Sequence, residues 1–164
     1  MRRDRRKAAN LGGRVLVDSM LLVLLVVGSV DRRLIERHKR LRDFTIEDYD
    51  RLRSLLDKFS GIVTTPNVLT EVSNLAVHQD SASTEVKARL RLGLAALAGK
   101  LNERYLPSRA VVALEEFRFL GLTDSANLLV EGVTILTCDA VLYLASLKKG
   151  LAAINFNHLR GGWI

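Results

Sequence analysis

Residues 15–30 read VLVDSMLLVLLVVGSV, and this stretch decides the fold. Its first three residues form a short valine-rich run after a pair of glycines, which predicts a central strand buried on both faces. Asp18 follows the strand directly, and residues 19–27 are apolar on every side, which predicts a helix packed inside the domain and ended by Gly28 and Ser29. The stretch therefore predicts a buried strand, an acidic residue at its end and a buried helix.

Strands and helices continue to alternate along the rest of the chain. Further strands are predicted at residues 62–64, 133–137 and 152–154. Helices are predicted at 31–41, 46–59, 66–76, 84–101, 109–119, from 123 or 124 onward, and at 141–147. Short strands separated by helices predict an α/β fold, a three-layer α/β/α domain with a central, mostly parallel, short-stranded sheet.

The composition favours one domain with a polyanionic partner. The 164 residues are 48% apolar with only two prolines, so a single domain spanning 1–164 is expected. Lys and Arg number 25 against 18 Asp and Glu, a formal charge of +7, which favours nucleic acid as the partner over a merely solvated basic surface. Aromatic residues make up only 5%, so no base-stacking platform is evident and recognition is expected to rely on phosphate contacts.

Two segments are expected to carry most of the positive charge. One is the basic N-terminal segment 1–13, and the other is residues 31–59, which are expected to form a helical hairpin inserted into the domain, with Thr45 and Asp48 as a capping box. Their outward side chains would form a cationic wall able to contact phosphates. The candidate residues are Arg2, Arg3, Arg5, Arg6, Arg32, Arg33, Arg37, Lys39, Arg40, Arg42, Arg51 and Arg53.

The beginning of the chain also allows a different interpretation. Basic residues followed by an apolar run imitate a secretory signal, which would make the protein exported or membrane-associated. Against this, Asp18 interrupts the apolar run, no A-x-A cleavage site follows, and the 12 residues after Asp18 are too few to span a bilayer. Cys138 is the only cysteine, which excludes an intramolecular disulfide and suits a reducing compartment, so a cytoplasmic protein without a membrane segment is expected.

Four acidic residues are candidates for a metal site. Asp18 and Asp139 each follow a predicted strand, and ligands of parallel sheets collect at the carboxyl ends of strands. Glu71 lies on the helix after the second strand, and Asp124 opens a later helix. Taken singly, Asp124 and Asp139 could be helix caps and Glu71 a solvated helix residue. Their joint placement at one predicted edge favours a cation instead, because buried carboxylates are costly without one, and oxygen ligands suit Mg²⁺.

Four blocks of the sequence carry a resemblance to a known family. They are LVDSMLL (16–22), TTPNVLTEVSNL (64–75), GLTDSANLL (121–129) and ILTCDAVLYLA (135–145). In this order and at these separations they resemble the signature blocks of PIN-domain ribonucleases, with VapC-like bacterial members among them. The resemblance covers nearly the whole chain. It implies a small α/β/α domain in which three or four acidic residues bind Mg²⁺ or Mn²⁺ and hydrolyse RNA phosphodiester bonds.

Position by position, the resemblance implies that Asp18, Glu71, Asp124 and Asp139 are the catalytic acids. Asp18 and Asp139 are expected to be direct metal ligands, with the other two acids orienting metal-bound waters or a second ion. Thr137 matches the family's usual Ser or Thr and could donate its hydroxyl to a ligand carboxylate, or could simply be a strand residue.

The chain departs from the family pattern at two positions. Met20 replaces a small polar residue, and Cys138 stands where a polar residue is more common. A thiol is a poor Mg²⁺ ligand, so Cys138 is assigned no catalytic role.

The predicted function is that of a metal-dependent endoribonuclease with RNA as its substrate. Many bacterial members of the family are toxins of the VapBC kind, so the resemblance raises a toxin role with an antitoxin protein and a homodimer as partners, although no feature of the sequence itself specifies either. The alternative is a catalytically weak module of PIN fold that binds RNA or another protein. Metal-dependent cleavage separates the two.

Overall fold

The computed structural model describes residues 11–77 and 82–160, which contain one parallel five-stranded sheet. The strands are β1 (Arg14–Val17), β2 (Gly61–Thr64), β3 (Asn102–Glu103), β4 (Val133–Thr137) and β5 (Ala153–Asn155). Their order across the sheet is β3-β2-β1-β4-β5, and every neighbouring pair is parallel. The predicted three-layer α/β/α class, with a short-stranded parallel sheet at its centre, is confirmed.

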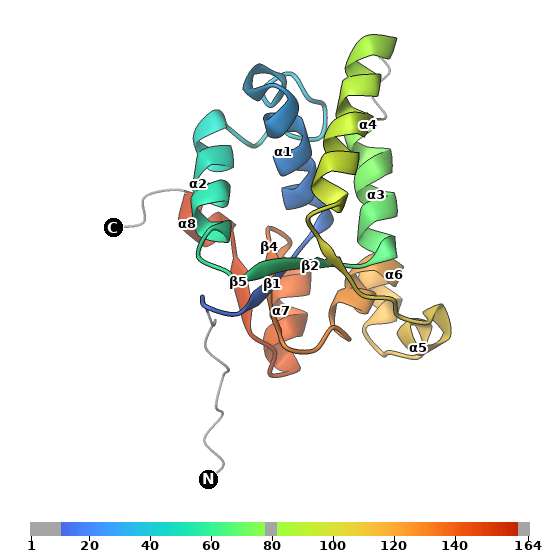
Figure 1. Ribbon diagram of the computed structural model, residues 1–164. Helices are drawn as coiled ribbons and strands as arrows, with labels where there is room; N and C mark the ends of the chain where they lie inside the picture. Colours follow the sequence, from blue (N-terminus) through green and yellow to red (C-terminus); the bar gives the residue numbers. More distant parts are fainter. Residues whose placement is uncertain (1–10, 78–81, 161–164) are drawn as a thin grey trace.

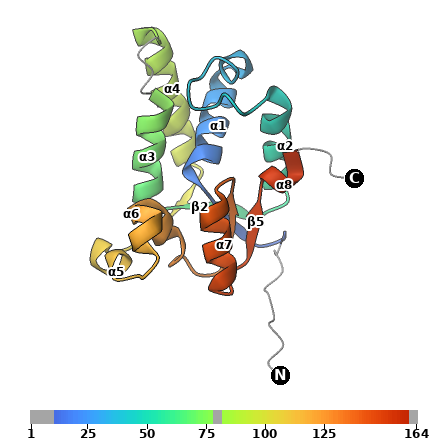
Figure 2. The ribbon, with the colours of Figure 1, turned by 180° about the vertical axis from the view of Figure 1, so that it is seen from behind.

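Helices cover both faces of this sheet (Figures 1 and 2). On one side lie α1 (Ser19–Val30), the 3₁₀ turn η1 (Arg32–Leu34), α2 (Ile46–Leu56), α3 (Pro66–Val77) and α4 (Thr84–Ala98). On the other lie α5 (Ser108–Val112), α6 (Phe117–Asn127) and α7 (Ala140–Lys148), and the short α8 (Asn157–Arg160) is near α2. Within the described ranges, no helix is both long enough and apolar enough to cross a membrane.

The strand order places the end of β1 beside the end of β4. The chain runs from β1 through β2 to β3 in one direction, and then crosses back to β4 and β5 on the other side of β1. Val17 is paired with Leu136, and the amide of Asp18 donates to the carbonyl of Leu136 at 3.0 Å. In open α/β sheets the point where the order reverses is the usual ligand crevice. Asp18 and Thr137 both lie there.

Helix α1 is the centre of the core, as its apolar sequence predicts. Leu21, Leu22 and Leu24 are fully buried among the surrounding helices and the sheet. The helix does not end at Gly28 as predicted, because it continues to Val30. A β-carbon at Gly28 would lie 2.4 Å from the ring of Tyr49. Gly28 is therefore a position of close approach between α1 and α2, and not a helix terminator.

Residues 31–44 differ from the predicted helix. After η1 the chain forms successive three-residue turns, in which His38 N donates to the Ile35 carbonyl, Leu41 N to that of His38, and Phe44 N to that of Leu41. These four residues are each three apart and all are buried. A repeat of three suits 3₁₀-type turns better than the 3.6-residue period of an α-helix, so the predicted hairpin retains only its second helix, α2.

Smaller predictions had mixed outcomes. The capping box of Thr45 and Asp48 is confirmed. The side chain of Ser83 caps α4, which begins at Thr84 as predicted and ends at Ala98. Gly121 has φ 75° and kinks α6, which agrees with the predicted turn before a helix that carries Asp124. The two-residue edge strand β3 was not predicted. Arg2, Arg3, Arg5 and Arg6, with most of the basic segment 1–13, lie outside the described residues.

Candidate functional site

Asp18 lies at the centre of the carboxyl edge and is 4% exposed. Its Oδ1 accepts from the amide of Leu21 at 2.9 Å, which makes Asp18 the N-cap of α1. Its Oδ2 accepts from the amide of Cys138 at 2.8 Å and from the hydroxyl of Thr137. Burial raises the pKa of Asp18, the three hydrogen bonds oppose this, and the charge of Asp139 raises the pKa further. The carboxylate is buried and held only by neutral donors.

Thr137 joins Asp18 to Asp139. Its hydroxyl donates to the carboxylate of Asp18 and accepts from the amide of Asp139 at 2.8 Å. Thr137 is the last residue of β4 and is fully buried, so the hydroxyl is fixed by the sheet. The side chain therefore couples the two acids that end the adjacent strands.

Asp139 is exposed and caps α7. Its Oδ1 accepts from the amides of Val141 and Leu142 at 2.7 and 2.9 Å. Asp139 is therefore a helix cap, as one of the two interpretations predicted. Only one of its two carboxylate oxygens, Oδ1, takes part in the cap. The second oxygen accepts no hydrogen bond from any other described residue, which leaves it available to a cation that approaches from solvent.

Glu71 lies in the second turn of α3 and is oriented by a residue of α1. The hydroxyl of Ser19 donates to Oε2 of Glu71 at 2.7 Å. Ser19 follows Asp18 directly and is itself buried, so it ties the glutamate to the end of β1. Sequence reasoning missed this residue. The sequence feature that could have identified it is a serine directly after Asp18 inside an otherwise apolar stretch.

Asp124 completes the acidic cluster, which we define as Asp18, Glu71, Asp124 and Asp139. Burial raises the pKa of Asp124 to about 7, and the charges of the other three acids contribute to that rise. The four predicted acids lie at the N-terminus of α1, on α3, on α6 and at the N-terminus of α7, and the charges of the other three act on Asp124. None of the four forms a salt bridge with another described residue.

The chemistry of this donor set fits a hard, hydrated cation. In the described part of the chain, no group of three or more His, Cys, Asp or Glu side chains is arranged so that it could hold a metal ion. Mg²⁺ is commonly bound through only one or two carboxylates and keeps several of its waters. One turn beyond Asp124, the side-chain amide of Asn127 is buried without a hydrogen-bond partner, as is the hydroxyl of Ser125. Such groups are usually satisfied by ordered water.

Asn157 supports the cluster from the C-terminal side and was given no role from the sequence. Its side-chain amide donates to the carbonyl of Cys138 at 2.8 Å, next to the Cys138 amide that binds Asp18. Cys138 itself keeps its thiol protonated, because burial and the nearby Asp18 raise the thiol pKa.

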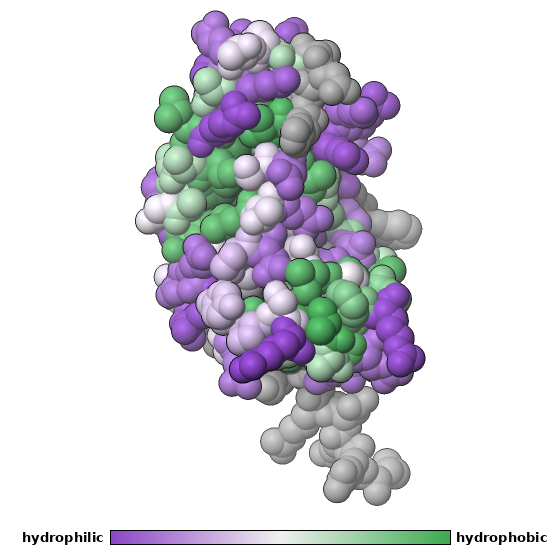
Figure 3. All heavy atoms as spheres, turned by 90° about the vertical axis from the view of Figure 1, so that its right-hand side faces the viewer, coloured by the Kyte–Doolittle hydropathy of each residue, from purple (hydrophilic) through white to green (hydrophobic). Residues whose placement is uncertain are grey.

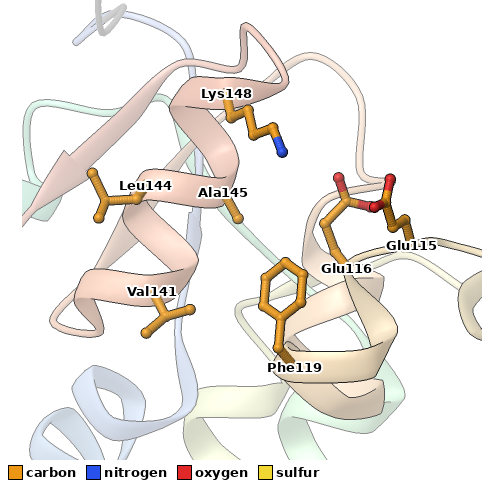
Figure 4. A pocket seen from close by; sticks show the side chains of 7 residues that line it. All are labelled: Glu115, Glu116, Phe119, Val141, Leu144, Ala145 and Lys148. Atoms are coloured by element: carbon orange, nitrogen blue, oxygen red, sulfur yellow. The ribbon is translucent and has the colours of Figure 1, made fainter.

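Two surface hollows lie near the acids or their helices. A groove of about 490 Å³ between α3 and the segment 105–108 is lined by Glu71. A separate apolar hollow of about 260 Å³ lies between the beginning of α6 and α7, where the ring of Phe119 points toward Val141, Ala145 and Lys148 (Figure 4). None of the four acids lines this second hollow.

The predicted cationic wall is partly neutralised by its own acids. Arg32 pairs with Asp50, Arg33 pairs with Asp31 at 2.8 Å, and Arg51 pairs with Asp48 at 3.4 Å. The turn at residues 32–34 lies beyond the far end of α1, a 12-residue helix and therefore about 18 Å long, measured from Asp18. This part of the wall does not border the acidic cluster.

Comparisons of the chain with protein-family models, with curated proteins and with solved structures found no match. The PIN-domain resemblance therefore remains a prediction that depends on the four sequence blocks.

Proposed function

We propose that the protein is a metal-dependent endoribonuclease that hydrolyses RNA phosphodiester bonds at the acidic cluster. The observation that supports this proposal is the position of Asp18 where the strand order reverses, coupled to Asp139 through Thr137. The charges of Asp18, Asp139 and Glu71 raise the pKa of Asp124, and none of these four acids has a salt bridge in the described chain. Such a concentration of negative charge is expensive unless a cation compensates it. A cation bound there would sit where substrates of parallel sheets bind.

The residues of the cluster would divide the work of holding Mg²⁺ or Mn²⁺. Asp18, fixed by Thr137 and by the Cys138 amide, and Asp139, with one oxygen outside its helix cap, would hold the ion directly. Glu71 and Asp124 would act through water. When bound, the ion supplies an activated water and neutralises charge that develops on the phosphate. With a pKa of about 7, Asp124 can hold or release a proton near neutral pH.

The charge of the chain supports a nucleic acid as the substrate. A formal charge of +7 attracts a polyanion and offsets its repulsion by the acidic cluster. The choice of RNA over DNA comes from the sequence resemblance. An antitoxin partner, a homodimer and a cytoplasmic location stay predictions from the sequence.

Incubation of the purified protein with labelled single-stranded and structured RNA tests the proposal. We expect cleavage with Mg²⁺ or Mn²⁺, its loss in EDTA, and its loss in Asp18→Asn. Asp50→Asn is the matched control, because Asp50 is an exposed aspartate paired with Arg32. Cleavage that survives both EDTA and Asp18→Asn would contradict the proposal. RNA binding without metal-dependent cleavage would favour the alternative of a catalytically weak binding module.

A further inference from the structure

The groove between α3 and the segment 105–108 borders one member of the acidic cluster, Glu71. Glu71 lines it at one side, together with Leu122 and Thr123, which precede Asp124. Its volume of about 490 Å³ is within the range of built ligand sites, roughly 300–1,000 Å³. The groove lies on the side of the molecule that carries α3, α5 and α6. On this side, hydrophilic and weakly polar side chains form a band between two hydrophobic patches (Figure 3). A substrate bound to the cluster would extend into this groove.

One wall of the groove is a polar stripe of α3. Asn67, Thr70, Glu71 and Asn74 all line it. Their spacing of three, four and seven residues puts them on one face of the helix, while Val68 and Val72 bury the opposite face. The side chains of Asn67, Thr70 and Asn74 form no hydrogen bond with any other described residue. They are free to bind polar edges of a ligand.

The other wall carries an exposed aromatic ring, that of Tyr105. The amide of Arg104 donates to the carbonyl of Thr64 at 2.8 Å, which extends the β2–β3 pairing by one residue. Tyr105 therefore lies at the carboxyl end of an edge strand, on the same side of the sheet as Asp18 and Asp139. It is 78% exposed. A single exposed aromatic residue is ordinary, but one that shares a groove with Glu71 is placed beside the reacting centre.

Two arginines are close to Tyr105 in the sequence. Arg104 precedes Tyr105, and Arg109 follows Ser108, which also lines the groove. Both arginines are exposed, and neither forms a salt bridge within residues 11–77 and 82–160. An exposed aromatic ring on a segment that also carries unpaired arginines offers the two features that bind single-stranded nucleic acid, which are a surface for base stacking and cations for phosphates.

We propose that this groove binds an unpaired stretch of RNA and that Tyr105 stacks on one of its bases. The inference rests on the proposed function, because it takes the acidic cluster as the place where the strand is cleaved. Bases within a duplex are already stacked on each other, so a ring at the protein surface gains a stacking partner only from an unpaired base. The ring of a tyrosine loses little freedom on binding, since it has only two side-chain torsions. The groove thus selects single-stranded over double-stranded substrate.

Fluorescence anisotropy in EDTA tests binding without hydrolysis. The probes are a labelled single-stranded RNA of about 12 nucleotides, within the usual site size, and a blunt duplex of the same sequence. We expect Tyr105→Ala to weaken binding of the single strand by about 5- to 100-fold, the effect of losing one stacked base, and to change duplex binding by less than about twofold. Tyr105→Phe keeps the ring and should bind as the wild type. Phe119→Ala is the matched control, because Phe119 is a 59% exposed aromatic residue that lines the other hollow.

Cleavage kinetics separate this inference from the proposed function. If the wild type cleaves with Mg²⁺, we expect Tyr105→Ala to raise KM with little change in kcat, because stacking away from the reacting atoms contributes to ground and transition states alike. Equal single-strand affinity of wild type and Tyr105→Ala overturns the inference even if metal-dependent cleavage is found, and leaves the groove to a protein partner. Failure of the wild type to bind single-stranded RNA would also overturn the inference. Loss of single-strand affinity in Tyr105→Ala, in a protein that never cleaves, supports the inference and contradicts the nuclease.

Discussion

Asp18 and Asp48 are equally buried aspartates that the protein treats in opposite ways. Each is 4% exposed, and each accepts hydrogen bonds near the beginning of a helix. Asp48 accepts from Arg51 at 3.4 Å and from Arg160 at 3.1 Å, in addition to the amide of Thr45. Asp18 accepts only from two amides and a hydroxyl. The chain supplies the counter-charge for one aspartate and leaves the other without it.

This difference shows why burial alone does not identify a site. The charge of a buried carboxylate that is paired with arginines is already compensated, so a bound cation would not stabilise it further. A buried carboxylate held by neutral donors, with further carboxylates beside it, carries an uncompensated charge. Burial raises the pKa of both Asp18 and Asp124, as expected for carboxylates without a counter-charge. The two aspartates therefore provide a matched pair for testing where a cation binds.

The largest expected effect is a difference in RNA cleavage between variants of Asp18 and Asp48. Asp18→Asn should lower RNA cleavage per folded molecule by about 100- to 1,000-fold, because a direct metal ligand is worth several kcal/mol in the transition state. Asp48→Asn should leave cleavage per folded molecule unchanged. The measurement is the initial rate in Mg²⁺, normalised to the folded fraction from circular dichroism. Equal losses in both variants would remove the distinction between the two sites.

The next effect concerns stability and its pH dependence in the absence of metal. The pKa of Asp124 in the folded protein is about 7, against an ordinary value of 3.8. The folded state therefore binds a proton more tightly than the unfolded state, and this contribution to stability is lost as the pH rises from about 4 to 7. Asparagine cannot ionise, so Asp124→Asn avoids the destabilisation caused by the charged carboxylate. At pH 8 the variant should therefore raise the free energy of unfolding by about 2–4 kcal/mol.

Urea unfolding in EDTA at pH 8 and at pH 4 measures this difference. The gain of Asp124→Asn should be largest at pH 8 and nearly absent at pH 4, where the wild-type carboxyl is protonated in the folded state. Saturating Mg²⁺ should reduce the gain at pH 8, because the ion compensates the wild-type charge. A gain that does not change with pH would mean that the charge of Asp124 is not its cause.

A smaller effect is expected where Thr137 couples the acids. Thr137→Val keeps the shape of the side chain but removes the donor to Asp18 and the acceptor of the Asp139 amide. Loss of such a supporting hydrogen bond typically costs about 10- to 100-fold in activity or metal affinity. We expect cleavage to fall in that range and the half-saturating Mg²⁺ concentration to rise. Thr137→Ser keeps the hydroxyl and should restore both, which a purely packing role would not predict.

The smallest effect belongs to the self-compensated aspartate. Asp48→Asn weakens two arginine contacts and one side of the capping box, and should lower the free energy of unfolding by about 1–2 kcal/mol. Asp50→Asn, which removes the exposed partner of Arg32, should change it by less than about 0.5 kcal/mol. Urea unfolding at pH 7 compares the two. If Asp50→Asn lowered the free energy of unfolding more than Asp48→Asn, the claim that the buried ion pairs stabilise the fold more than the exposed one would be contradicted.

Local patterns predicted most of the fold, and the four acids remain a candidate site predicted from the sequence. The end of β1 at Asp18, the helix that begins at Pro66 and the turn at Gly121 each follow from residues next to them in the chain. The segment 31–44 was mispredicted because its apolar residues fit a helix of 3.6 residues per turn almost as well as turns of three. Strand β3 is too short to carry a pattern of its own.

By itself, the sequence determined the alternation of strands and helices, the burial of the helix after the first strand and the acids that follow the strands. These features depend on periodicity and on turn chemistry, which act over a few residues. Only the tertiary structure decided that Thr137 bridges Asp18 and Asp139, that Ser19 orients Glu71, and that Arg160 compensates Asp48 across 112 residues. Such contacts depend on strand order and packing between remote segments, and local spacing carries no information about which remote partner will be near.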